Sequence, residues 1–407
     1  MSYSGFSLGD APVVLGDPPV AGIASITHDL HGRLTIRVRR KSDPRDLFSM
    51  LKHERLTISS PLGTQPLVQI KRAVCTRMSG SEVYDEFWAA TALITSETLP
   101  PDSLVVRKYY LTGIHFLDGV IEIDAGGFHW KLDLLDDFFA TSKMLDAEGS
   151  SVVTATLTST PIPFSRSQEA DDAAHVTALL LSFAAGGVIG IVRTDEEREG
   201  RLAAVRLQMS GTRAQGFSLA PILSDTMGPG VIKPFIEASY FPAIAVSKRL
   251  PLARLILTLL DLRGESVVQI QGLLAAHFLE IVRYHYALNV LVPNGKATHS
   301  GDQFYSPNTR RVMSFETILQ DFAASIGLTG WSTGFTKFRN RVVHGDEIEG
   351  TTPLEQCANV LEVLHFCDRI ILALLEWDRA GGKYIPCTDP ERVTSTSYGI
   401  NVKPFTR

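Results

Sequence analysis

The sequence predicts an α+β protein of several domains, in which a β-rich, sandwich-like N-terminal domain is followed by an all-helical bundle. Short segments that alternate apolar and polar residues dominate the chain before residue 164, and clusters of Gly, Pro, Asp and Ser separate them. From residue 236 onward, apolar residues recur at helical spacing instead. The chain has 407 residues, of which 44% are hydrophobic, and this length suffices for two or three domains of roughly 100–200 residues each.

The β-rich domain is predicted over residues 1–164. Arg33–Arg39 alternate strictly between polar and apolar side chains, as a strand with one buried face does. The turn-like Asp29–Gly32 joins this strand to the apolar stretch Val20–Thr27, and together they predict a hairpin. Further strands are expected at Leu67–Val74, Glu86–Ile94, Val105–Tyr110, Gly119–Ile123, Phe128–Leu132 and Val152–Leu157. Many short strands with turns between them favour a sandwich or jelly-roll-like domain.

Residues 165–235 are predicted to form an α/β connector that packs on the β-rich domain. A helix should begin near Ser165, continue along the apolar stripe of Asp171–Ala185 and end at the glycine pair that follows. Two strand-like segments, Val188–Thr194 and Leu202–Ser210, come after this helix.

The helical bundle is predicted over residues 236–385, and an irregular tail over residues 386–407. Ala243–Leu262 is apolar with few breaks, and Glu265–Leu288 carries a helical stripe of apolar side chains. Ser314 can cap a helix that runs to Gly327. Thr352-Pro353-Leu354-Glu355 is a capping box with proline at the first helical position, and it predicts a helix that ends near Arg379. Helices joined by short links form antiparallel bundles.

Bulk properties favour a cytoplasmic protein without a membrane segment. The N-terminus has neither the basic nor the apolar stretch of an export signal. The longest apolar run, Val176–Val192, is too short to cross a membrane and contains Ser182 and two glycines. The four cysteines show no C-x-x-C spacing and are expected to be reduced core thiols. A net charge of −5 argues against a protein that coats long nucleic acids, so any contact with nucleic acid must be local.

The segment Phe338-Arg339-Asn340-Arg341-Val342-Val343-His344-Gly345 carries the sharpest chemical signal. As a helix, it would turn Phe338 and Val342 into the bundle. The opposite face would gather polar and basic side chains, namely Lys337, Asn340 and His344, flanked by Arg339 and Arg341. The sequence has no carboxylate between Thr333 and Gly345, so positive charge is concentrated in an otherwise acidic protein. Such a surface suits an anionic group such as phosphate.

This segment resembles the signature of HEPN domains (higher eukaryotes and prokaryotes nucleotide-binding), which consists of an arginine, a polar residue, variable residues and a histidine. Arg339, Asn340 and His344 match that pattern position by position. The resemblance implies a helical bundle that dimerises and brings two motifs together. The N-terminal half is loosely similar to the ApeA type of antiphage proteins, through VAGIASITHDLHGRLTIRV, LTGIHFLDG and the helix-then-strand pattern of residues 171–194.

The resemblance further implies metal-independent cleavage of RNA, with no metal and no cofactor. His344 would act as a general acid or base on the ribose 2′-OH or on the leaving oxygen, and Arg339 would stabilise charge on the phosphorane. Asn340 would orient the imidazole or the phosphate. Lys337 and Arg341 would be auxiliary phosphate contacts, and Glu280, on the second bundle helix, is a candidate supporting group.

Two functions of different classes follow from these expectations. In the first, the protein is a cytoplasmic homodimeric endoribonuclease that cleaves tRNA or other host RNA and causes abortive infection. Its N-terminal domain would hold the bundle silent or sense a phage-derived trigger. In the alternative, the bundle only dimerises or binds nucleotide, and the β-rich domain binds a protein or a ligand such as a glycan.

The segment Arg283-Tyr284-His285-Tyr286 combines basic and aromatic groups near the end of a predicted helix. Packing at the helix end is the preferred interpretation. Stacking of a nucleobase on the aromatic rings is the alternative.

Overall fold

A computed structural model shows that the chain adopts an α+β fold, which confirms the class predicted from the sequence. The structure describes residues 6–15, 20–29, 33–40, 55–59, 67–78, 84–95, 99–114, 119–135, 152–208, 222–223, 229–265, 267–328, 340–341, 344 and 353–377. The chain divides into two compact units. Unit 1 consists of Met1–Ala178 and Ile189–Gln215, and unit 2 consists of Leu179–Val188 and Gly216–Arg407. The predicted tail, residues 386–407, lies outside the described residues.

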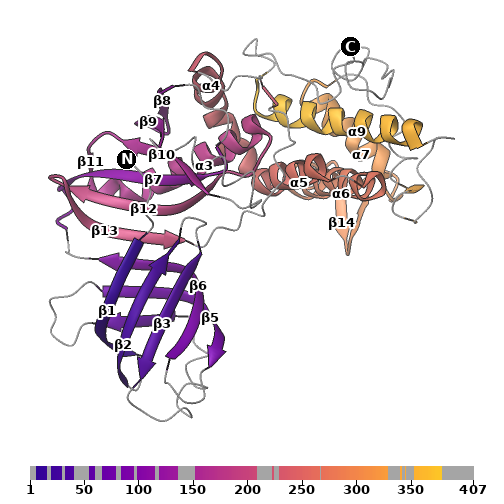
Figure 1. The fold of residues 1–407 in the computed structure, drawn as a ribbon. Coiled ribbons are helices and arrows are strands. Elements are labelled where there is room, and N and C mark those ends of the chain that lie inside the picture. The colour runs from indigo at the N-terminus through magenta and orange to yellow at the C-terminus, as the bar shows by residue number, and fades with distance from the viewer. Residues whose placement is uncertain are drawn as a thin grey trace. The chain divides into compact units, whose positions relative to one another are not determined.

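Unit 1 is built on one antiparallel sheet (Figure 1). Its strands along the chain are β1 (Phe6–Leu15), β2 (Val20–His28), β3 (Leu34–Arg40), β4 (Arg55–Ser59), β5 (Leu67–Met78), β6 (Tyr84–Thr95), β7 (Leu104–Thr112), β8 (Ile121–Ala125), β9 (Phe128–Leu134), β10 (Val153–Ser159), β11 (Ile162–Pro163), β12 (Gly190–Arg198) and β13 (Arg201–Gln208). In space they follow the order β3-β2-β1-β4-β5-β6-β13-β12-β7-β10-β9-β8, and β11 pairs with β7. The two strands of the predicted connector, β12 and β13, therefore lie in the middle of this sheet.

The first six strands close into a ring. β3 pairs with β2 along one edge and with β6 along the other, where Thr35 lies opposite Trp88. The later half of β6 pairs with β13, where Thr91 lies opposite Gln208. β6 reaches both partners because it is 12 residues long. The sequence predicted a sandwich-like domain, but the strands form one continuous sheet; alternation identifies a strand without specifying its neighbours.

The hairpin of β8 and β9 illustrates how the sequence positions the core of unit 1. Buried and exposed residues alternate strictly along β8, so that Ile121 and Ile123 point into the core. The turn consists of Gly126 and Gly127, both with positive φ, which is the backbone geometry that two-residue hairpin turns require. Across the hairpin, the fully buried Trp130 packs edge-on against Tyr109 of β7 at 5.8 Å between ring centroids.

Unit 2 is mainly helical. Its elements are the last residues of α3 (Ser167–Ala185), α4 (Pro229–Ser247), α5 (Leu252–Gly264), α6 (Val268–Tyr286), the π-helix η3 (Ala287–Leu291), the hairpin β14 (Thr298–Ser300) and β15 (Gln303–Tyr305), α7 (Phe315–Ser325) and α9 (Pro353–Leu374). α5 and α6 pack together, and both pack against α9. The hairpin lies between η3 and α7 in the chain.

Local signals account for most helix boundaries in unit 2. The apolar stretch Ala243–Leu262 is divided between α4 and α5, because a proline, Pro251, disfavours helical backbone in the residue before it. Ser314 caps α7 as predicted, and its Oγ accepts the Thr317 N–H at 3.1 Å. α9 begins at Pro353, the position predicted by the capping box.

Aromatic stacking marks the core of unit 2. Phe235 of α4 lies 6.1 Å from Phe183 of α3 and 5.2 Å from Trp377, measured between ring centroids. Both Phe183 and Phe235 are fully buried. Cys367 of α9 is a buried thiol and Cys357 a half-buried thiol, and neither forms a disulfide. In the part of the chain that the structure describes, each helix is too short or too polar to cross a lipid bilayer.

Candidate functional site

The predicted catalytic motif is described only in part. Asn340, Arg341 and His344 are helical and exposed. Asn340 and His344 are separated by one helical turn, so their side chains emerge on the same face. Arg339 and Lys337 lie outside the described residues. The structure therefore places an amide and an imidazole together on an accessible helical surface of unit 2, with a guanidinium beside them.

Glu280 is engaged by its own helix. Its carboxylate accepts a hydrogen bond from Arg283 Nε at 2.7 Å, one turn further along α6. Both side chains are mostly buried. One turn earlier on α6, His277 lies 3.1 Å from an Arg254 nitrogen on α5. Glu280 thus forms an ion pair within its own helix. Its supporting role at the motif remains a prediction.

The basic and aromatic segment at the end of α6 contributes one side chain to the core of unit 2 and two to its surface. Tyr286 is buried; its hydroxyl donates to Asp321 at 2.7 Å, and its ring lies 5.3 Å from Phe322 of α7. Burial and this hydrogen bond raise the pKa of Tyr286 to about 12. Helix-end packing, the preferred interpretation, therefore applies to Tyr286. Tyr284 and His285 are only half-buried and belong to a different cluster on the surface of unit 2.

A buried ion pair joins α5 to α9. Arg263 Nη1 donates to Asp368 Oδ2 at 2.7 Å, and the two side chains are 1% and 0% exposed. His365, one turn before Arg369 and close to Arg263, is partly buried in the same region. Burial, followed by the positive charges of Arg263 and Arg369, lowers the pKa of His365 to about 4. The imidazole is therefore neutral at physiological pH.

Acidification from pH 6.5 to 4 is expected to destabilise unit 2 through His365. The unfolded chain binds a proton at this histidine near its ordinary pKa of 6.5, whereas the folded helix binds it only near a pKa of about 4, so acid favours unfolding. The loss should be about 2 kcal/mol after allowing for partial solvent access. Urea unfolding across this pH range, compared with His365→Gln, measures the effect.

The variant comparison separates His365 from Asp368, whose pKa is raised by burial. The His365→Gln protein should lose less stability between pH 6.5 and 4 than the wild type does. Equal pH dependence of the two proteins would show that His365 does not bind its proton in the way described.

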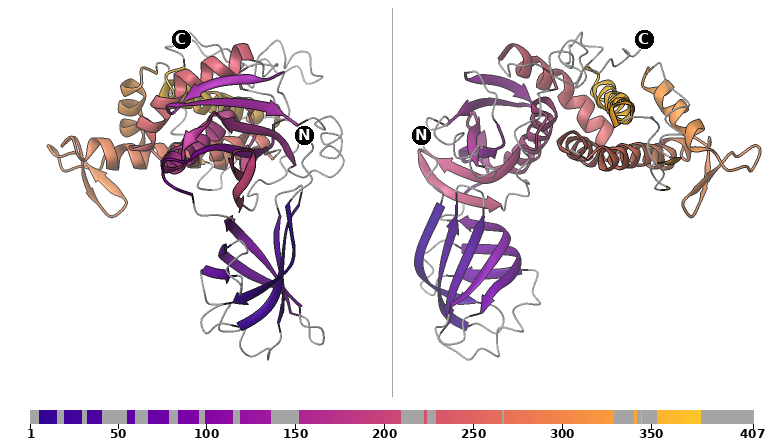
Figure 2. Two further views of the ribbon diagram at one scale, coloured as in Figure 1. Left: turned by 90° about the vertical axis from the view of Figure 1, so that its left-hand side faces the viewer. Right: turned by 45° about the vertical axis from the view of Figure 1, so that its right-hand side comes forward.

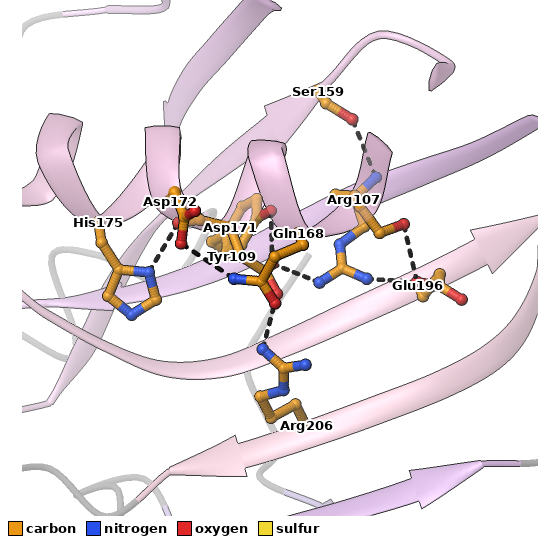
Figure 3. A network of polar contacts seen from close by, with 10 residues as sticks. Arg107, Tyr109, Ser159, Gln168, Asp171, Asp172, His175, Glu196 and Arg206 are labelled. Carbon is orange, nitrogen blue, oxygen red and sulfur yellow. Dashed lines mark hydrogen bonds and ion pairs between the residues drawn. The ribbon is translucent and has the colours of Figure 1, made fainter. Parts of the chain in front are cut away.

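Unit 1 contains a buried network of charged side chains between the sheet and the N-terminal part of α3 (Figure 3). The Arg107 guanidinium on β7 donates to Glu196 on β12 and to Asp171 on α3. Tyr109 donates to the same Asp171 oxygen at 2.9 Å, and Arg206 on β13 donates to the other oxygen at 2.6 Å. Arg107, Asp171 and Glu196 retain only 5%, 3% and 5% of their exposure.

The charges of this network balance one another. Burial opposes the charge of Arg107, but Tyr109, Asp171 and Glu196 together raise its pKa above the ordinary value. Two guanidiniums face two carboxylates, as buried charges require. Because the four groups lie on α3, β7, β12 and β13, the network links α3 to three strands of the sheet. This network was not predicted from the sequence. The signal was a charged residue in the inward register of β7, where Val105, Tyr109 and Leu111 are all buried.

Metal-ligating residues do not cluster in the described parts of the chain: nowhere in them do three or more His, Cys, Asp or Glu side chains come together in a way that could hold a metal ion. No family model, curated protein or solved structure matches the chain.

Proposed function

We propose that this protein is a HEPN-type endoribonuclease of antiphage defence that cleaves tRNA or other host RNA without a metal ion. The observation that carries the proposal is the pair Asn340 and His344, exposed on one helical face within a mainly helical unit. Arg339 completes the Arg-x4-His motif in the sequence. An accessible imidazole is the group most often used for proton transfer near neutral pH.

The chemistry follows from the groups in the motif. The ribose 2′-oxygen bonds to the adjacent phosphorus while the bond from phosphorus to the 5′-oxygen breaks. A base takes the 2′-OH proton and an acid protonates the 5′-oxygen, which leaves a 2′,3′-cyclic phosphate and a 5′-hydroxyl end. His344 supplies one of these proton transfers, and Arg339 stabilises the extra charge on the phosphorane. Asn340 orients the imidazole or the phosphate, and Lys337 and Arg341 contact neighbouring phosphates.

The direct test of this chemistry is cleavage of purified tRNA by the purified protein, with and without a chelator. The proposal predicts fragments with 5′-hydroxyl ends in both samples. Cleavage that stops when divalent ions are removed would contradict a metal-independent mechanism. Tight nucleotide binding with no fragments would favour the alternative, a non-catalytic module.

Homodimerisation through the helical bundle is part of the proposal, because a second copy of His344 can supply the other proton transfer. An exposed apolar strip on α5 and α6 supports it. The contact between Arg254 and His277 aligns these helices, so Leu257, one turn along α5, lies beside Leu273, one turn back along α6. Leu257 is 42% exposed and Leu273 51% exposed, and Ile270 extends the strip. Exposed apolar strips of this kind mark interaction surfaces.

Introducing charge into this strip is expected to separate the dimer. The Leu257→Asp/Leu273→Asp protein should remain folded, since both side chains are exposed, but should elute as a monomer and lose RNA cleavage. The control is Leu104→Asp in unit 1, which changes a leucine that is 60% exposed and should alter neither property. Size-exclusion chromatography with light scattering measures the mass. A dimer that survives the double substitution would exclude this surface.

We further propose that unit 1 controls the ribonuclease, either by holding it silent or by recognising a phage-derived trigger. The division of the chain into a sheet-based unit and a helical unit supports this assignment. Cleavage of host RNA would then arrest the infected cell before the phage multiplies.

A further inference from the structure

A hairpin with an aromatic base follows α6 in unit 2. Figure 1 and Figure 2 show the hairpin of β14 and β15 projecting beyond the neighbouring helices of this unit. Phe304 is its only described buried strand residue, at 1% exposure, and anchors it. The Phe304 ring lies 5.7 Å from Tyr284 of α6 and 5.0 Å from His299 of β14, and the Arg283 guanidinium lies 5.8 Å from its centroid.

Two rings of this cluster face solvent while Phe304 supports them. His299 is exposed, and its ring is inclined by only 31° to the Phe304 ring. The imidazole therefore packs on the Phe304 ring, and because His299 as a whole is exposed, part of its ring remains accessible to solvent. Tyr284 is half-buried and stands edge-on to His299, with 6.4 Å between their centroids. Aromatic side chains that pack against the protein and keep part of the ring exposed are suited to stack on nucleobases.

Positive charge accompanies the aromatic rings. Lys296, Arg310 and Arg311 are all exposed, and Asp302 is the single carboxylate in residues 296–312. This local excess stands out in a protein with a net charge of −5. Exposed lysines and arginines next to stacking rings provide contacts for a phosphate backbone.

The loop that carries the two arginines has a defined backbone. The Arg310 N–H donates to the Ser306 carbonyl at 2.8 Å, and the Ser306 N–H donates to the Arg311 carbonyl at 2.9 Å. Arg310 adopts a φ of +56°, a region that residues other than glycine seldom occupy. Such a conformation persists only where the surroundings enforce it, and it occurs preferentially at binding sites.

We propose that this surface, defined by Tyr284, Lys296, His299, Arg310 and Arg311, binds single-stranded RNA. Bases stack on His299 and Tyr284, and the three cations contact the phosphates. The choice of RNA rests on the proposed ribonuclease function of the same unit. Paired bases in a duplex hide their faces in the helical stack, so the surface selects unpaired segments such as loops and strand ends.

Binding is tested on the full-length protein with a fluorescein-labelled 12-nucleotide 2′-O-methyl RNA, which has bases and phosphates but no 2′-OH to attack. Fluorescence anisotropy gives the affinity as a function of salt. His299→Leu should weaken binding roughly tenfold, whereas His299→Phe should retain it, because phenylalanine preserves stacking. Arg310→Ala/Arg311→Ala should reduce the slope of log affinity against log salt by about 1.4, from the loss of two phosphate contacts.

The matched control is Arg198→Ala/Arg201→Ala at the β12–β13 turn of unit 1, which also removes two positive charges. It should leave affinity within twofold of the wild type. Equal loss in the control and the Arg310/Arg311 variant would overturn the proposal, as would unchanged binding in His299→Leu or equally tight binding of a 12-base-pair duplex.

The outcome separates this inference from the proposed function. Stacking-dependent binding by a protein that cuts no RNA would support the surface and contradict the ribonuclease. RNA cleavage by a protein whose His299 and Arg310/Arg311 variants bind and cut normally would support the ribonuclease and contradict the surface.

Discussion

Replacing His344 by alanine is expected to reduce RNA cleavage by about 100- to 10,000-fold, the usual contribution of a general acid or base. The side chain is exposed on a helix, so its removal should leave the fold and the unfolding midpoint unchanged. Alanine is also compatible with a helix. The measurement is the single-turnover rate of tRNA cleavage by equal concentrations of the wild type and the variant.

Two variants sharpen this test. His129→Ala removes a half-exposed histidine, which pairs with Asp124 in unit 1, and should cleave at the wild-type rate. Asn340→Ala should reduce the rate less than His344→Ala does, because an orienting group acts through the imidazole. A His344→Ala protein that cleaves as fast as the wild type would remove this histidine from the mechanism.

Replacing Arg107 by methionine is expected to lower the free energy of unfolding of unit 1 by about 3–5 kcal/mol, the typical cost of removing one partner from a buried ion pair. Methionine retains an unbranched stem of the same reach as the arginine stem and removes the guanidinium. The substitution leaves Asp171 and Glu196 buried with one guanidinium, Arg206, in place of two. Urea unfolding and hydrogen exchange in β7, β12 and α3 measure the loss.

The control is an exposed ion pair on the same sheet. Lys131 lies 3.0 Å from Asp133, and the two side chains are 53% and 38% exposed. Lys131→Met should cost less than about 1 kcal/mol, as exposed pairs do. Adding Asp171→Asn and Glu196→Gln to Arg107→Met should restore part of the stability. An Arg107→Met protein as stable as the wild type would show that the buried network does not hold α3.

The sequence predicted most strands and helices of the fold because their signals are local. The alternation in Arg33–Arg39 identified β3, and Ser314 and Pro353 marked the starts of two helices. β1, β4, β11, β14 and β15 were not predicted. Long-range pairing was not predictable: β6 joins β3 and β13, which lie far apart in the sequence, and no local pattern encodes that choice.

Of the candidate site, only the residues that lie close together in the sequence could be predicted. Asn340 and His344 lie within one helical turn, so spacing alone placed them together. The aromatic hairpin brings together Tyr284, His299 and Phe304 from α6 and two strands, and the sequence gives no spacing rule for such a cluster. The buried network likewise depends on the register between Arg107 and Glu196 on neighbouring strands.

The most direct measurement of the central claim is sequencing of RNA 5′-hydroxyl ends in cells after a short induction of the wild type or of His344→Ala. The ribonuclease proposal predicts new ends at defined positions in tRNA or other host RNA with the wild type, and none of these ends with the variant at equal protein levels. The same ends in both samples, or no new ends with the wild type, would contradict it.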